Sequence, residues 1–144
     1  VEVVTLKNST ASEINEPWPI TYINRDQFLI IRFFKTYLRI RSRVKSSDFV
    51  LANGLFQETA IALLFSGKRS VAKVVGDPVW ERAFNRGETS LTIEEFNKSK
   101  LKFRHKTQRL FLRWCLNQFS QITCPSLELK NLIQDNNLHL THDN

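Results

Sequence analysis

The apolar positions of this chain fall into two kinds of segment that alternate along the sequence. Short runs of β-branched and apolar residues are typical of buried strands, and stretches with an apolar residue every three or four positions are typical of helices. The runs predict strands at 1–6, 20–23, 48–52, 70–75 and 121–124. The periodic stretches predict helices at about 24–45, 57–66, 99–119 and 125–134, with a short helix after Thr92, whose spacing to Glu95 suits a capping box.

Strands that alternate with helices indicate βαβ units and a parallel sheet. We therefore expect an α/β fold, a Rossmann-like parallel sheet with helices on both faces, over residues 1–134, and a frayed tail at 135–144. Right-handed crossovers place the carboxyl ends of the strands along one edge, where such sheets bind ligands. The loops expected at this edge are 24–25, 53–54, 76–78 and 125–126.

The first predicted helix has an apolar and a basic side. Asn24 or Asp26 can cap its start, and Gly67 suits the position after the end of the following helix. The apolar side, which we expect to face the core, is formed by Phe28, Ile31, Phe34 and Leu38, and the basic side by Arg32, Lys35, Arg39 and Arg43.

Two of the edge loops carry residues suited to a sugar. Gly54 permits close backbone approach, a carboxylate accepts hydrogen bonds from hydroxyls, and a tryptophan face packs on a sugar ring. Ordinary structure explains the same residues: a plain turn at 53–54, Asp77 capping a turn, Trp80 in the core and Glu81 in solvent. Because the preceding strands should be neighbours, we expect these loops to form one shared substrate site. In a full-length parent protein, Asp77→Ala should then reduce activity far more than folding stability. The residues of this site are Asn53, Gly54, Gly76, Asp77, Trp80 and Glu81; no catalytic residue is identified.

The predicted helix at 99–119 is strongly basic and contains interleaved aromatic residues. Three interpretations fit: a solvated face, contact with an anionic membrane, or contact with nucleic acid. A helix-turn-helix, RRM or KH signature does not occur, which disfavours nucleic acid. The residues expected to contact a membrane are Lys100, Lys102, Arg104, Lys106, Arg109 and Arg113.

Composition narrows the partners without choosing one. The net charge of +7 favours nucleic acid, anionic lipid or phosphorylated ligands. Cys115 and Cys124 fit no metal spacing and are interpreted as buried free thiols, and His105, His139 and His142 as surface residues. We expect no metal and no cofactor, and a location in the cytoplasm or at the inner face of the membrane. Because the chain lacks Met and opens inside a predicted strand at Val1, we expect a fragment of a longer protein.

Three motifs in the same order resemble one enzyme family. Residues 47–54, SDFVLANG, resemble the D-V-V-H-A-N-G strand and loop of group 1 (family 4) glycosyltransferases of the GT-B type. Residues 67–77 are similar to the next unit, G-K-P-V-V-x-K-V-V-G-D, and residues 80–83 match the W-E-R-A of a subset. Residues 122–130 are similar to V-I-V-P-S-E-Y-L-K. The resemblance covers about residues 1–134.

The resemblance implies the N-terminal, acceptor-binding portion of a retaining glycosyltransferase that transfers a hexose from a nucleotide-sugar to a glycan or lipid-linked acceptor. The donor would bind mainly to a C-terminal domain with two glutamates, which is missing, so we expect no activity from this chain alone. In the loop after the strand that ends at Val75, this chain has Gly76 where the family commonly has a histidine. Two alternatives are a noncatalytic binding module and one subunit of a split enzyme.

The first strand of the family fold and its Gly-rich loop should precede Val1. In the order 3-2-1-4-5 that strand lies between the strands predicted at 1–6 and 48–52. Without it, these two strands must pair directly, separate or recruit another chain.

Overall fold

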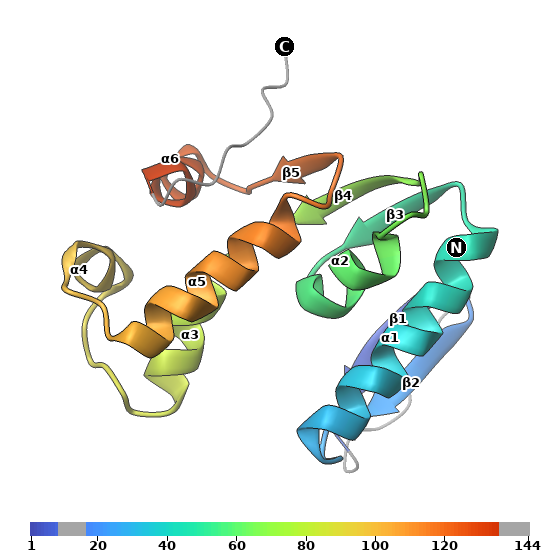
Figure 1. Cartoon of the computed structure of the whole chain (residues 1–144), viewed down its shortest axis with the longest axis horizontal. Helices are drawn as coiled ribbons and strands as arrows, with labels where there is room; N and C mark the ends of the chain where they lie inside the picture. The colour runs from blue at the N-terminus through green and yellow to red at the C-terminus, as the bar shows by residue number, and fades with distance from the viewer. Residues whose placement is uncertain (9–16, 136–144) are drawn as a thin grey trace.

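The protein is described here by a computed structural model that covers residues 1–8 and 17–135. Helices and strands follow one another largely as the sequence pattern predicts, but residues 78–85 form a helix that the pattern does not predict (Figure 1). The strands of the described residues are β1 (Val3–Lys7), β2 (Ile20–Asn24), β3 (Phe49–Ala52), β4 (Arg69–Lys73) and β5 (Gln121–Thr123). The helices are α1 (Leu29–Ser46), α2 (Phe56–Leu63), α3 (Pro78–Asn85), α4 (Ile93–Lys98), α5 (Phe103–Leu116) and α6 (Leu127–Asp135).

All pairings between the described strands are parallel, as expected, but the strands form two sheets. One contains β1 and β2, with Val3 opposite Ile20, and the other has the order β3-β4-β5, with β4 in the centre. The strands β1 and β3 are therefore separate, which is one of the three outcomes expected for a sheet without its central strand.

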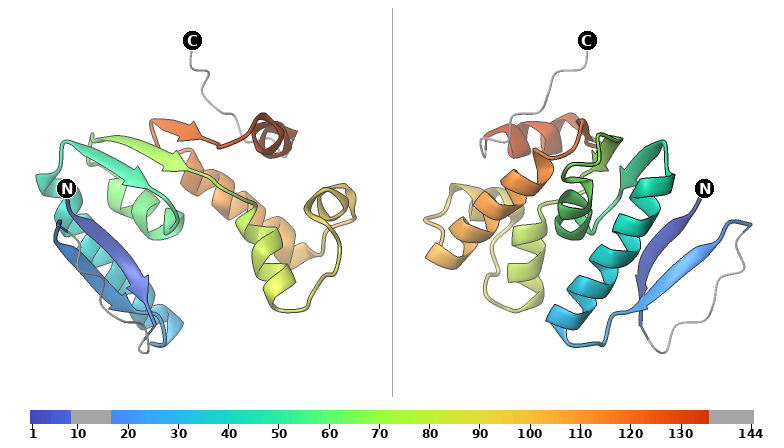
Figure 2. Two further views of the ribbon diagram at one scale, coloured as in Figure 1. Left: turned by 180° about the vertical axis from the view of Figure 1, so that it is seen from behind. Right: turned by 45° about the vertical axis from the view of Figure 1, so that its right-hand side comes forward.

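The three-stranded sheet is covered on one face only by the described helices. Ser70, Ala72 and Val74 of the β4 region are buried, whereas Lys73 and Val75, which point the other way, are exposed. The buried face packs on α2 and α5, and α1 lies beside α2 (Figure 2). The opposite face exposes Phe49, Leu51 and Val75. The expected cover of helices on both faces is thus not found among residues 1–8 and 17–135.

Helix α1 buries a different side from the one expected. Thr36, Ile40 and Val44 are buried at spacings of four. The expected apolar face is exposed, so that expectation is wrong: Phe28, Ile31, Phe34 and Leu38 are all more than half exposed. The buried stripe of Thr36, Ile40 and Val44 has smaller side chains than the exposed one. Smaller side chains permit close packing of the helix against β1, β2 and α2. Arg41 supports this orientation, because Nη1 donates to the carbonyls of Ala62 (2.6 Å) and Leu64 (2.9 Å) at the end of α2.

The helix ends agree with the sequence only in part. Thr92 and Glu95 form the expected capping box of α4. Asn24 and Asp26 do not cap α1, which begins at Leu29; instead Asn24 Oδ1 accepts from the Asp26 N–H at 2.8 Å. The expected helix at 99–119 begins later, at Phe103, and Gly67 lies beyond the end of α2 with a φ of +64°.

Candidate functional site

The loops after β3 and β4 open at the same edge of the three-stranded sheet. The two strands are hydrogen-bonded neighbours with Ala52 opposite Ala72, which confirms the neighbour relationship expected from the sequence. Gly54 takes a φ of +101°, a conformation that an L side chain rarely adopts, and Leu55 follows in the left-handed region. Glycine is therefore required for this turn whether or not a ligand approaches it.

Asp77 is held in place by protein groups on both of its carboxylate oxygens. It is the N-cap of α3, where Oδ1 accepts from the N–H groups of Val79 (2.8 Å) and Trp80 (3.2 Å). Oδ2 accepts from Arg109 Nη2 at 3.0 Å. Asp77 is only 7% exposed, so its geometry is that of a buried structural cap.

Arg109 joins three helices. It reaches from α5 to Asp77 at the start of α3, contacts the Asn97 side-chain oxygen of α4, and lies over the Phe96 ring with 5.4 Å between Cζ and the ring centroid. Its side chain is 17% exposed. This residue was expected to contact a membrane, but its guanidinium points into the protein.

Trp80 has partners that explain its presence without a ligand. It lies in α3, stacks on Phe84 at a centroid distance of 5.2 Å, and donates from Nε1 to the Leu91 carbonyl at 2.9 Å. These contacts agree with the ordinary interpretation of Trp80 as a residue that packs against the core. Glu81, on the next position, is exposed, and its carboxylate folds over Gly76, where a Cβ would collide with it.

The six expected substrate-binding residues therefore divide into two groups. Asp77 stabilises the start of α3 as its cap, and Trp80 joins α3 to the segment before α4 through its bond to the Leu91 carbonyl. Asn53 and Glu81 are exposed, Gly54 offers backbone at the sheet edge, and Gly76 lies under the carboxylate of Glu81. The exposed amide of Asn53 and the exposed carboxylate of Glu81 can accept hydrogen bonds from hydroxyl groups, such as those of a sugar. Within the described residues there is no group of three His, Cys, Asp or Glu side chains that could hold a metal ion.

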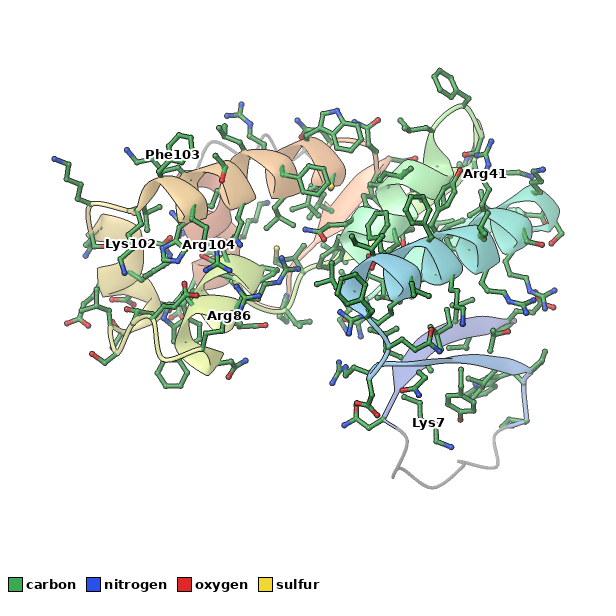
Figure 3. The ribbon with its side chains drawn as sticks, turned by 60° about the horizontal axis from the view of Figure 1, so that its bottom comes forward. Lys7, Arg41, Arg86, Lys102, Phe103 and Arg104 are labelled. Carbon is green, nitrogen blue, oxygen red and sulfur yellow. The ribbon has the colours of Figure 1, made fainter. Side chains whose placement is uncertain are left out.

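A second polar cluster, centred on Glu88, was missed by sequence reasoning. Glu88 Oε1 accepts from Arg104 Nη1 at 2.9 Å, and Oε2 lies 2.9 Å from His105 Nε2. Arg86 lies 3.8 Å from the same carboxylate, and Figure 3 shows Arg86 and Arg104 close together. The hydrogen bond with His105, aided by the positive charges of Arg104 and Arg86, lowers the pKa of Glu88.

His105 is 3% exposed and packs against Phe96, so its expected surface location is wrong. Helical spacing could have placed it inside, because it shares a face with Leu112 and Leu116, seven and eleven positions further on. The two other histidines, His139 and His142, lie outside the described residues.

The remaining basic residues of α5 and its approach lie at the surface. Lys100, Lys102, Arg104 and Lys106 are exposed and Arg113 is half-buried, so five of the six residues expected at a membrane remain near solvent. No helix in the described part of the chain has the length and apolar character that a membrane span requires.

Both cysteines are free, as expected. Cys115 is buried, and burial raises the pKa of its thiol to about 12. Cys124 is only half-buried, and desolvation raises its pKa as well. Neither thiol is therefore poised for nucleophilic chemistry at neutral pH.

Comparison with known proteins gives this chain no relatives: no family model, no curated protein and no solved structure matches it.

Proposed function

We propose that this chain is the acceptor-side portion of a retaining GT-B glycosyltransferase of group 1, one that uses a nucleotide-sugar in glycan or glycolipid synthesis. The observation that carries the proposal is the arrangement of its strands. In a doubly wound sheet whose order 3-2-1-4-5 is extended by a sixth strand, loss of the first strand leaves a pair, 3-2, and a triplet, 4-5-6. The pair β2-β1 and the triplet β3-β4-β5 have this composition and chain order.

The position of α1 supports the same assignment. It leaves β2, packs against both strands of the first sheet and against α2 of the second, and then enters β3. A crossover helix between two strands of one parallel sheet does this. The two sheets are thus interpreted as parts of one Rossmann-like sheet. Among the described residues, none forms the strand that would lie between β1 and β3.

In this proposal the acceptor lies at the carboxyl edge, against the 53–54 loop and the exposed carboxylate of Glu81. Asp77 and Trp80 then act as positioning residues, because their bonds to backbone and to Arg109 fix the direction in which α3 leaves the loop. Donor and acceptor must be held together for transfer, and nothing described here resembles a nucleotide-sugar site. We therefore expect no transfer by this chain alone.

Saturation-transfer NMR with a panel of hexosides tests the acceptor site directly. We expect weak binding, with Kd on the order of 1 mM. Asn53→Ala and Glu81→Ala should each weaken this binding further. Glu94→Ala, which removes an exposed carboxylate from α4, is the matched control and should leave the signal unchanged. Absence of saturation for every sugar, or turnover of a nucleotide-sugar by the pure chain, would overturn the proposal.

A noncatalytic binding module, alone or as one subunit of a split enzyme, is the second candidate. The pairing of Asp77 with Arg109 favours it, because these two charges are engaged with each other and in capping α3. Neither charge is then open to take part in catalysis. As a binding module alone, this candidate predicts sugar binding by the same edge and no transfer when any donor-binding polypeptide is added. As one subunit of a split enzyme, it predicts transfer only in the presence of its partner polypeptide.

A further inference from the structure

The outer side of α5 exposes a row of large apolar side chains. Phe103 is 82% exposed, Leu110 is 65% exposed and Trp114 is 41% exposed, and the three follow one another at spacings of seven and four. These spacings place them on one side of the helix, opposite the buried Leu112 and His105. Phe111 extends the row, because its ring stacks on Trp114 at a centroid distance of 5.9 Å.

Basic residues surround this row, and acidic residues are missing from it. Lys100 and Lys102 are exposed before the helix, and Lys106 is exposed on it. Figure 3 shows Lys102 and Phe103 at the same end of the helix, with Phe103 on the side away from Arg86. The chain has no Asp or Glu between Glu95 and Glu128. Arg104 and Arg109 of the same helix pair with Glu88 and Asp77, but Lys100, Lys102 and Lys106 form no ion pair with an acidic side chain among the described residues. The apolar row therefore carries a rim of three unneutralised lysines.

We propose that this outer side of α5 docks on the surface of an anionic lipid bilayer. A helix with an apolar side flanked by lysines lies in the bilayer interface, with rings and aliphatic chains between the headgroups and the lysines on the phosphates. Tryptophan is favoured at that depth. The docking surface consists of Phe103, Leu110, Phe111 and Trp114, with Lys100, Lys102 and Lys106 at its rim.

The charge pattern favours lipid over the other occupants of an apolar face. A symmetric dimer through α5 would bring the lysines of the two copies together, which costs affinity. Nucleic acid would satisfy the lysines, but its phosphate backbone leaves an exposed leucine beside a phenylalanine without an apolar partner. An anionic bilayer satisfies both features. The docking surface is separate from the sheet edge, so this inference does not depend on the proposed transferase function.

Vesicle co-sedimentation of the whole chain is the test, with phosphatidylcholine alone and with added phosphatidylglycerol. We expect salt-sensitive binding to the anionic vesicles, and a blue shift of tryptophan fluorescence that Trp114→Phe diminishes. Lys102→Glu with Lys106→Glu should weaken binding by at least about fivefold per residue. Phe103→Ser with Leu110→Ser should weaken it by about tenfold or more.

Matched controls lie on the open face of the sheet, away from α5. Lys73→Glu reverses one exposed charge, where the lysine variant reverses two, and Phe49→Ser with Leu51→Ser removes an exposed phenylalanine and an exposed leucine; neither control should alter binding. Circular dichroism verifies that each variant is folded. Equal binding to neutral vesicles, displacement of vesicles by an oligonucleotide, an α5-dependent dimer in sedimentation, or equal losses in the controls would each overturn the proposal.

Discussion

The carboxylate of Asp77 and the guanidinium of Arg109 form an ion pair of 3.0 Å between segments 32 residues apart. Asp77 also caps α3, and Arg109 also contacts Asn97 and Phe96 of α4. The pair therefore fixes three helices relative to one another and sets how α3 leaves the sheet edge. From sequence, Asp77 was expected to serve substrate and Arg109 a membrane, whereas the structure shows both engaged inside the protein.

Substitution of Asp77 should lower stability, which reverses the order of effects expected from sequence. Asp77→Ala removes the cap and leaves Arg109 without its carboxylate, and we expect a loss of about 3 kcal/mol. Asp77→Asn keeps a good N-cap and removes only the charge, so about 1–2 kcal/mol should be lost. Urea denaturation measures both. A loss below about 0.5 kcal/mol for Asp77→Ala, the size of an ordinary surface change, would show that the Asp77–Arg109 pair and the cap contribute little to stability.

Helix α1 offers a direct test of which of its apolar stripes is buried. Ile40 is 7% exposed and Leu38, two positions earlier, is 61% exposed. Ile40→Ala should cost about 2–5 kcal/mol, because it leaves a cavity against the strands and α2. Leu38→Ala should change the free energy of unfolding by less than about 0.5 kcal/mol. Chemical denaturation of the two variants decides the matter, and equal losses would mean that the stripe of Leu38 is covered.

Sequence reasoning located the elements better than it located their partners. The β-branched runs at 48–52 and 70–75 identify β3 and β4, because strand preference is a local property of those residues. The buried side of α1 was predicted wrongly, since both stripes have helical spacing and only packing against β1, β2 and α2 selects between them.

The candidate site shows the same limit. Asp77 is followed directly by Pro78, a combination typical of a helix start, so its role as a cap was readable and was left open. Its pairing with Arg109, and that of Glu88 with His105, join residues 32 and 17 positions apart. No local pattern encodes a contact at that separation, so tertiary structure was needed to find either pair.

Glu58 should make the protein less stable as the pH rises. Burial raises the pKa of this carboxyl above 4.5, and the nearby charges of Arg82 and Arg32 offset the effect only in part. Between 4.5 and the folded-state pKa the native protein binds more protons than the unfolded chain, so stability falls with rising pH through that window. Glu58→Gln should therefore raise Tm at pH 7 and leave it unchanged well below pH 4.5. Thermal melts at both pH values test this, and a lower Tm for the variant at pH 7 would contradict it.

Glu88 should make the protein more stable as the pH rises, which is the opposite of the effect of Glu58. The pKa of Glu88 lies below 4.5, because His105 donates a hydrogen bond to it and Arg104 and Arg86 lie nearby. The stability that it contributes is present above pH 4.5 and is lost as the pH falls through the lowered folded-state pKa. Glu88→Gln should lower Tm at pH 7, with a difference that vanishes in acid. Glu94→Gln is the matched control on the exposed side of α4; an equal effect in both variants would exclude a specific role for this cluster.

The edges of β1 and β3 should exchange their amide hydrogens faster than β4 does. β4 pairs with β3 on one side and with β5 on the other, whereas β1 and β3 each pair on one side only with strands of residues 1–8 and 17–135. An unpaired strand edge leaves N–H groups open to water, which lowers protection in native-state hydrogen exchange. We expect residues 69–73 to exchange slowest, with faster sites at 3–7 and 49–52. A peptide or polypeptide that supplies a parallel strand between the two edges should slow exchange in both at once. Equal protection of all three strands in a monomeric sample would show that the edges are already paired, and the interpretation of two sheets as one incomplete sheet would then be wrong.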